Sequence, residues 1–275
     1  PGTDGWREFY DATAALLLAR DSAGRAGPLA TLGWLRDGIG AARRALGTGA
    51  AAADDAAMLV GAYQFFGDYL PWYLHVPAAL MIAPTDRRAG LRRLEQARRH
   101  AALCAPAAAL LTAAAHAWDD DPDAALRLCD ALQSDVPGNH LVGSLRAYVL
   151  AREGRVNDAY AALTNAVVRL ERDNRSGVRA LLADQYYELG RLALAATNYS
   201  DARARFASAA EFSGRKTELR AWSALQLGVT CDLLHERTGA RRQYAIAAAT
   251  AADASVVKRY AVAFLRKPYA GQCLE

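Results

Sequence analysis

The chain has 275 residues, of which 53% are hydrophobic and 23% charged, and its formal net charge is +4. This balance is typical of an ordered protein and argues against a disordered one. The paired arginines at 87–99 are interspersed with Glu95 and apolar positions. We therefore expect no nucleic-acid partner, because such a partner needs positive charge gathered on one face.

Composition also argues against several kinds of site. No apolar run reaches the roughly 18 residues that span a bilayer, so no transmembrane segment is predicted. The four cysteines form no C-x-x-C pair and have no His at a zinc-ligand offset, and we predict neither a metal site nor a cofactor. Only three lysines occur among 33 basic residues, a bias that indicates a GC-rich bacterial genome. The compartment is left open between cytoplasm and periplasm.

Two helices are predicted at the start of the chain, in residues 1–53. Apolar residues recur at helical spacing from Trp6 to Arg20. Pro28 is suited to the first turn of a second helix, which we expect to run to about Leu46. Together these segments predict an N-terminal helical hairpin.

Residues 54–105 are predicted to form a divergent repeat with an enlarged aromatic first helix. This helix is expected over 56–83, and a second one over 87–102. Pro71 and Pro77 should bend or break the first helix, because each removes a backbone donor and clashes with the preceding turn. Its expected N-terminal cap is Asp54 or Asp55.

Four regular repeats are predicted in residues 106–254, and the second begins one repeat length of about 34 residues after the first. They start at Pro106, His140, Ala183 and Ala221. Position 20 of each repeat holds a small residue, where two helices can cross closely; these residues are Ala125, Ala159, Ala202 and Ala240. In the third repeat, Gly190 and Phe206 add a small and a large residue at positions 8 and 24. Residues 255–275 are expected to supply a capping helix and a tail.

This order of small and large residues resembles the tetratricopeptide repeat (TPR) at nearly every signature position. The resemblance implies an all-α fold, an α-solenoid of antiparallel helix pairs wound into a right-handed superhelix. His235 departs from the pattern, because it stands at position 15, where the family has a turn glycine; this weakens the prediction of a tight turn there. The stretch GDYLPWYL, the residues 86–91 and the terminal FLRKPY also resemble a group of bacterial repeat proteins, which implies no activity.

In a solenoid of this family, the concave surface is lined by the first helix of each repeat. Positions 2, 5, 9, 12 and 13 point away from the packed second helix. They predict a partner-binding groove made of Trp118, Tyr148, Arg152, Asp184, Tyr187, Arg191 and Trp222, with Leu110, Ser144, Leu225 and Asp232 at further groove positions. Tyr, Trp and Arg carry much of the binding energy at protein interfaces. An equally weighted alternative is that the N-terminal hairpin or the closing helix fills this groove, which would make these residues intramolecular contacts.

The known carboxylate clamp of chaperone-binding members needs Lys and Asn at several groove positions. Ser144, Tyr148 and Tyr187 stand there instead, so we do not predict an acidic peptide end as the ligand.

A second candidate pocket lies on the aromatic helix, at Tyr63, Asp68, Tyr69, Trp72 and His75. Asp68 and His75 are seven residues apart and could form an acid–base pair. A structural role is the favoured interpretation, because aromatic helices beside prolines are usually core or oligomer contacts. The run Asp119–Asp121 lacks the Gly and distal Glu of a calcium loop, and Asp121 before Pro122 instead predicts a helix start.

The sequence thus predicts a non-catalytic scaffold or adaptor that holds a peptide or protein partner in its concave groove. Two alternatives remain open. One is a small-ligand sensor or an enzyme that uses the aromatic helix, and the other is a structural subunit that self-assembles as a homo-oligomer.

Overall fold

In the computed structural model the chain is mainly helical in the residues that the structure describes, which are 5–22, 28–69, 82, 84–173, 178–214 and 216–271. Thirteen α-helices and one short 3-10 helix occur in these ranges, without strands. The helices pack in sequential pairs, so the predicted class, an α-solenoid of helix pairs, is confirmed. The chain divides into two compact units, Pro1–Pro137 and Gly138–Glu275. The finer predicted domain boundaries stay a prediction.

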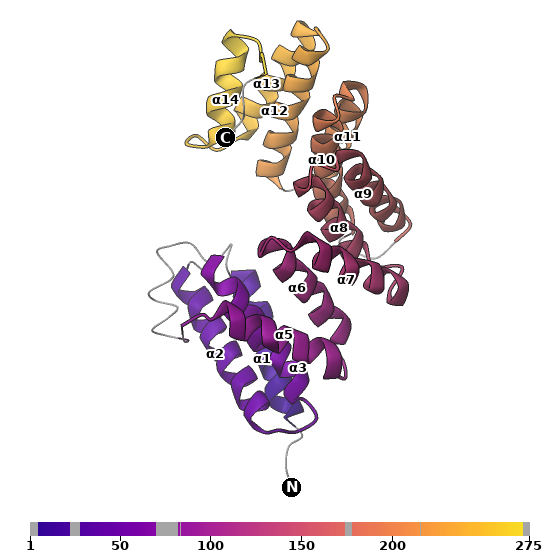
Figure 1. Cartoon of the computed structure of the whole chain (residues 1–275). Helices are drawn as coiled ribbons and strands as arrows, with labels where there is room; N and C mark the ends of the chain where they lie inside the picture. The colour runs from indigo at the N-terminus through magenta and orange to yellow at the C-terminus, as the bar shows by residue number, and fades with distance from the viewer. Residues whose placement is uncertain are drawn as a thin grey trace. The chain divides into compact units, whose positions relative to one another are not determined.

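The first unit holds the N-terminal hairpin, the divergent pair and the first regular pair (Figure 1). Each helix packs mainly on its neighbours in the chain. The elements are α1 (Trp6–Ser22), α2 (Pro28–Gly47), α3 (Ala53–Phe66), the 3-10 helix η1 (Gly67–Tyr69), α5 (Arg87–His100), α6 (Ala105–Trp118) and α7 (Pro122–Asp135). The helices α1 and α2 pack on each other, and Pro28 is the first residue of α2, as expected from the sequence.

The second unit holds three regular pairs and a closing helix (Figure 1). Its elements are α8 (His140–Arg152), α9 (Val156–Glu171), α10 (Val178–Ala195), α11 (Tyr199–Phe212), α12 (Thr217–Leu233), α13 (Arg237–Thr250) and α14 (Val256–Arg266). The closing helix begins one residue after Ser255, whose hydroxyl caps it by accepting a hydrogen bond from the Lys258 amide.

Burial follows the predicted repeat phase in all four regular pairs. The alanines at position 20 are each 0% exposed. Position 8 is equally crowded: a Cβ added to Gly190 would stand 2.6 Å from the ring of Phe206, and one added to Gly228 would stand 2.4 Å from the ring of Tyr244. In these two repeats the aromatic residue at position 24, on the second helix, therefore fills the space beside the glycine at position 8 on the first helix.

All four regular pairs make the same tight turn between their two helices. Position 15 has a left-handed backbone in each, with φ of 59° at Asp120, 72° at Gly154, 59° at Thr197 and 62° at His235. The amide of the next residue then donates to the carbonyl five positions earlier, as Glu236 does to Cys231 at 2.8 Å. This is the hydrogen bond of a Schellman helix ending. His235 therefore keeps the tight turn, and Asp121 begins α7 as its N-cap, as the sequence predicts.

We expect Thr197→Gly to raise the free energy of unfolding by about 0.5 to 1 kcal/mol, because a β-branched residue is strained at positive φ and a glycine is not. The reverse exchange at the equivalent turn, Gly154→Thr, should lower it by a similar amount. A Cβ at Gly154 meets no atom within 4 Å, so only the backbone is affected there. Urea unfolding of both variants tests this, and a shift of the same sign in both would contradict it.

One local prediction in the divergent pair is only partly covered by the described residues, and another is wrong. The α-helix α3 ends at Phe66, and only the short helix η1 follows it up to Tyr69; the remaining predicted helix, with Pro71 and Pro77, lies outside the described residues. The N-cap of α3 is Ala52, and neither Asp54 nor Asp55 caps the helix with its side chain. A cap residue must precede its helix, whereas both aspartates lie within the first turn.

Asp55 instead binds the turn between α5 and α6. Its carboxylate is 0% exposed and accepts hydrogen bonds from three successive backbone amides, Ala102 at 2.9 Å, Leu103 at 2.9 Å and Cys104 at 2.7 Å. These amides lie just before α6 and have no partner inside that helix. Burial, followed by the hydrogen bond and charge of Asp55, raises the pKa of the Cys104 thiol to about 11.

Candidate functional site

The main candidate site is a hollow of about 440 Å³ in the second unit, lined by residues of α8, α9 and α10. Its apolar lining, here called the floor, is formed by Ala147, Ala151, Val156, Leu163, Leu192 and Ala195. Its polar or aromatic lining, here called the rim, is formed by Ser144, Tyr148, Arg152, Gln185, Glu188 and Arg191. An apolar floor with a few directed polar groups is the usual composition of a ligand site.

The repeat architecture explains why this surface is open. α8 and α10 are the first helices of two successive repeats, and α9 packs on both of them. On α8, Leu150 and Val149 are buried in the core, whereas Tyr148 is 44% exposed. Ser144 and Gln185 join the two first helices at one place, because the Ser144 hydroxyl lies 2.7 Å from Oε1 of Gln185.

The polar side chains of the hollow are partly held in position. The guanidinium of Arg152 lies over the ring of Tyr148, 5.9 Å from its centroid, and this cation–π contact orients both groups. Arg191 pairs with Glu188 at 3.0 Å, and both of these side chains are about half exposed (58% and 48%). Exposed pairs of this kind contribute little to stability, so both can exchange partners with a ligand.

Three residues of the predicted groove therefore come together at the hollow: Tyr148, Arg152 and Arg191. Tyr187, in contrast, is half-buried against Phe206, with 5.6 Å between ring centroids. Burial raises the pKa of its phenol, which also makes a side-chain hydrogen bond with Gln226. We conclude that Tyr187 supports the packing of α10 on α12 rather than lining the hollow.

Asp184 and Trp222 lie in a different depression of about 530 Å³. There Asp184 forms an ion pair with Lys216 at 2.5 Å. Trp118 belongs to the first unit, where its ring lies 4.6 Å from that of Tyr69 and 4.9 Å from that of Phe66. Within the second unit, the predicted groove residues are therefore divided between the hollow, the packing around Tyr187 and this depression.

Two further groove positions are buried in the core. Leu225 is 0% exposed. The side chain of Asp232 is 2% exposed and accepts hydrogen bonds from the Tyr244 hydroxyl at 2.9 Å and the Tyr269 amide at 2.9 Å. Arg237 pairs with the same carboxylate at 3.1 Å and donates to the carbonyl of Phe264 at the end of α14. Asp232 thus fastens the closing helix and the tail that follows it.

The sequence pattern found Arg191 but missed three other residues on the α10 side of the hollow. Gln185, Glu188 and Leu192 stand at positions 3, 6 and 10, one step away from the predicted concave positions. The hollow lies between two neighbouring first helices, and α10 therefore contributes the face turned towards α8. On α8 the predicted positions 5, 9, 12 and 13 do line it. A template that also included positions 3, 6 and 10 would have found the missing residues.

The second candidate pocket is only partly covered by the structure, because Trp72 and His75 lie outside the described residues. Tyr63 is 7% exposed, so it belongs to the core. Asp68 accepts a hydrogen bond from Thr85, and Tyr69 packs under the guanidinium of Arg87 at 5.5 Å. The acid–base pair of Asp68 and His75 stays a hypothesis.

The described part of the chain holds neither a helix that is long and apolar enough to cross a bilayer nor a cluster of three metal-ligating side chains. Cys129 and Cys231, at repeat positions 24 and 11, are buried at 0% and 6% exposure, as the repeat phase predicts for small core residues.

Comparison with known proteins identifies the fold. No protein-family model and no curated protein matches the sequence. Among solved structures, the apo form of the quorum sensor NprR from B. thuringiensis is similar over 98% of this chain and 73% of its own, with a TM-score of 0.67 and 11% identity. NprR in complex with its cognate peptide NprX matches 94% of this chain and 71% of its own (TM-score 0.51, 13% identity).

The hetero-tetramer Cut9–Hcn1 of the APC/C is also similar, over 94% of this chain and 46% of the other, with a TM-score of 0.57 and 11% identity. At such identities the likeness concerns the fold alone. The chain has the fold of TPR-type helical repeat proteins, as its repeat pattern predicts.

Proposed function

We propose that this protein is a non-catalytic interaction module that holds a peptide segment of a partner protein in the hollow between α8 and α10. This proposal rests on the hollow, which has a volume of about 440 Å³. Its floor is apolar, and its rim includes Tyr148, Arg152 and Arg191. An apolar side chain of the peptide would be buried on the floor, and the rim would hydrogen-bond its backbone or polar groups.

Two further considerations support this proposal. Tyr and Arg are the residue types that most often dominate binding energy, and here they stand exposed beside a preformed apolar surface. A protein of similar fold, NprR, is known in complex with a cognate peptide, NprX. The identity of the partner and any self-association of this chain remain open predictions.

The proposal is tested by selecting peptides from a displayed random library on the purified protein and measuring their affinity by fluorescence anisotropy. We expect the double variant Tyr148→Ala/Arg152→Ala to weaken the selected peptides by about 10- to 100-fold, since truncating interface anchors costs about 1 to 3 kcal/mol. Ala195→Trp should have a similar effect, because it fills the hollow from an exposed position.

The matched control is Arg242→Ala/Ile246→Ala on α13. It removes an arginine and a large apolar side chain at the same spacing, in the same unit and at exposed positions. Affinity should stay within about twofold of the wild type in this control. Selected peptides that bind the control, the double variant and Ala195→Trp equally well would refute the hollow as the binding site.

A further inference from the structure

The helix α5 carries six arginines, and the structure separates them into two groups. Three have partners within the protein. Arg87 pairs with Asp119 and lies over the ring of Phe65 at 5.0 Å. Arg93 hydrogen-bonds Gln64, and Arg98 pairs with Glu95 at 2.7 Å. These three arginines hold α5 and its surroundings together, so their charges already have partners inside the protein.

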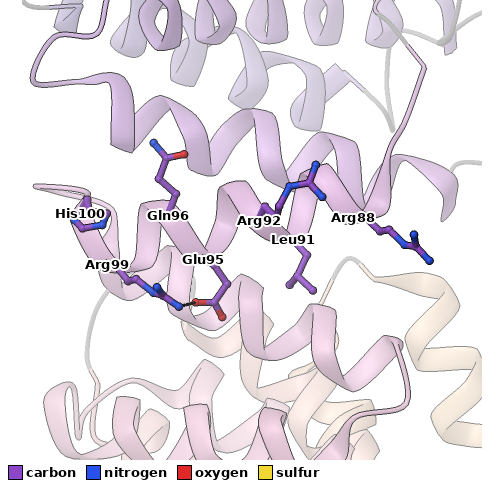
Figure 2. A pocket seen from close by; sticks show the side chains of 7 residues that line it. All are labelled: Arg88, Leu91, Arg92, Glu95, Gln96, Arg99 and His100. Atoms are coloured by element: carbon purple, nitrogen blue, oxygen red, sulfur yellow. Dashed lines mark ion pairs between the residues drawn. The ribbon is translucent and has the colours of Figure 1, made fainter.

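The other three, Arg88, Arg92 and Arg99, are exposed and line one hollow of about 630 Å³ together with Leu91, Glu95, Gln96 and His100 (Figure 2). They are spaced by four and seven residues, which places them on one face of the helix. Within the described part of the chain, Arg88 and Arg92 form no ion pair. Arg99 forms a long ion pair with Glu95 at 3.6 Å and, unlike the three half-buried arginines, remains 64% exposed.

We infer that this arginine face of α5, defined by Arg88, Arg92 and Arg99, docks an acidic segment of a protein partner. We choose an acidic partner because its charge is complementary to this face, and a guanidinium can bind a carboxylate through two parallel hydrogen bonds. Along the helix axis the three arginines are separated by about 6 Å and about 10 Å. A partner helix with carboxylates at the same two spacings can meet all three.

Other groups on this face favour a protein over a polyphosphate or a lipid surface. Figure 2 shows Leu91 and Glu95 on one flank of α5 and Gln96 and Arg92 on the other. Leu91 offers apolar contact, and Gln96 is held by Asp54 at 2.7 Å. The carboxylate of Glu95, 25% exposed, would repel an uninterrupted row of phosphates. A protein segment can place a neutral or basic residue opposite it.

This inference concerns the first unit and uses no residue of the hollow in the second, so the two proposals stand or fall separately. The test uses the full chain and a fluorescein-labelled helical peptide of Ala and Gln, with three glutamates spaced by four and seven residues. Parallel arms use single-stranded oligo(dT) and vesicles of phosphatidylserine with phosphatidylcholine. Binding is followed by anisotropy for the first two probes and by sedimentation for vesicles.

We expect the peptide to bind the wild type and to weaken about tenfold or more with Arg88→Gln/Arg92→Gln/Arg99→Gln, as the loss of three exposed ion pairs implies. Raising NaCl from about 50 mM to about 300 mM should also weaken it. The control Arg220→Gln/Arg241→Gln/Arg242→Gln removes the same charge from exposed positions of α12 and α13 and should change affinity less than about threefold.

Three results would overturn the inference. One is no measurable binding of the peptide, and another is an equal loss in the triple variant and the control. The third is tighter binding of oligo(dT) or of vesicles than of the peptide, which would reassign the face to another class of partner. The double variant Arg88→Gln/Arg92→Gln repeats the measurement if the triple variant has a lowered thermal midpoint.

Discussion

Replacing Asp55 with Ala should lower the free energy of unfolding by about 3 kcal/mol or more, the larger of the two strongest effects that we expect. The fully buried carboxylate accepts three backbone hydrogen bonds, from Ala102, Leu103 and Cys104. Without it, three amides at the start of α6 lose their acceptor, and each charge-assisted bond of this kind contributes about 1.5 to 3 kcal/mol. Water can partly replace the lost acceptor, so the loss of stability should be smaller than the sum of the three hydrogen-bond contributions.

The neighbouring aspartate provides the matched control. Asp54 makes one exposed hydrogen bond, from Gln96 at 2.7 Å, so Asp54→Ala should cost about 1 kcal/mol or less. Urea unfolding followed by circular dichroism gives both values. If the two variants were equally stable, the turn between α5 and α6 would not depend on the carboxylate of Asp55.

The second strong effect is expected from Gly90→Ala, which should cost about 2 to 3 kcal/mol. A Cβ at Gly90 would lie 2.6 Å from the backbone nitrogen of Phe65 and 2.8 Å from the carbonyl oxygen of Gly61. These are backbone atoms of α3, so no side chain can rotate away. The helices α3 and α5 would have to separate, and Leu94 and Ala97, both 0% exposed, would lose contacts.

The same substitution elsewhere should have the opposite sign. Gly33 lies inside α2, and a Cβ there meets no atom within 4 Å. Gly33→Ala should therefore raise the free energy of unfolding by about 0.5 to 1 kcal/mol, because Ala loses less backbone freedom in a helix. Thermal midpoints of the two variants provide the measurement. A rise with Gly90→Ala would mean that α3 and α5 do not cross as closely as described.

The repeat pattern predicted the fold well because it depends on local spacing. The alternation of Gly190 with Phe206, and the alanines at position 20, reflect how close two adjacent helices can lie. Such contacts join residues that are near in the chain, so the residues that make them recur at the same positions of each repeat. The turn at His235 was predicted less well, because His235 adopts a left-handed backbone without the glycine that the repeat pattern has there.

The candidate site was predicted only in part. Tyr148, Arg152 and Arg191 were found because a groove template marks the exposed side of first helices. Tyr187 and Asp232 occupy similar template positions, yet one packs on Phe206 and the other fastens the C-terminal tail. Which exposed position becomes covered depends on the neighbouring helix, and the period of a single repeat does not contain that information.

By itself, the sequence determined the class of fold, the phase of the four regular repeats and the small residues at their crossings. Each of these follows from contacts between helices adjacent in the chain. Only the tertiary structure decided that Asp55 binds the amides before α6 and that Asp232 anchors the tail after α14. It also decided which arginines of α5 remain exposed. These outcomes depend on partners that are distant in the chain. A buried polar side chain forms a hydrogen bond with whichever donor the tertiary packing places beside it.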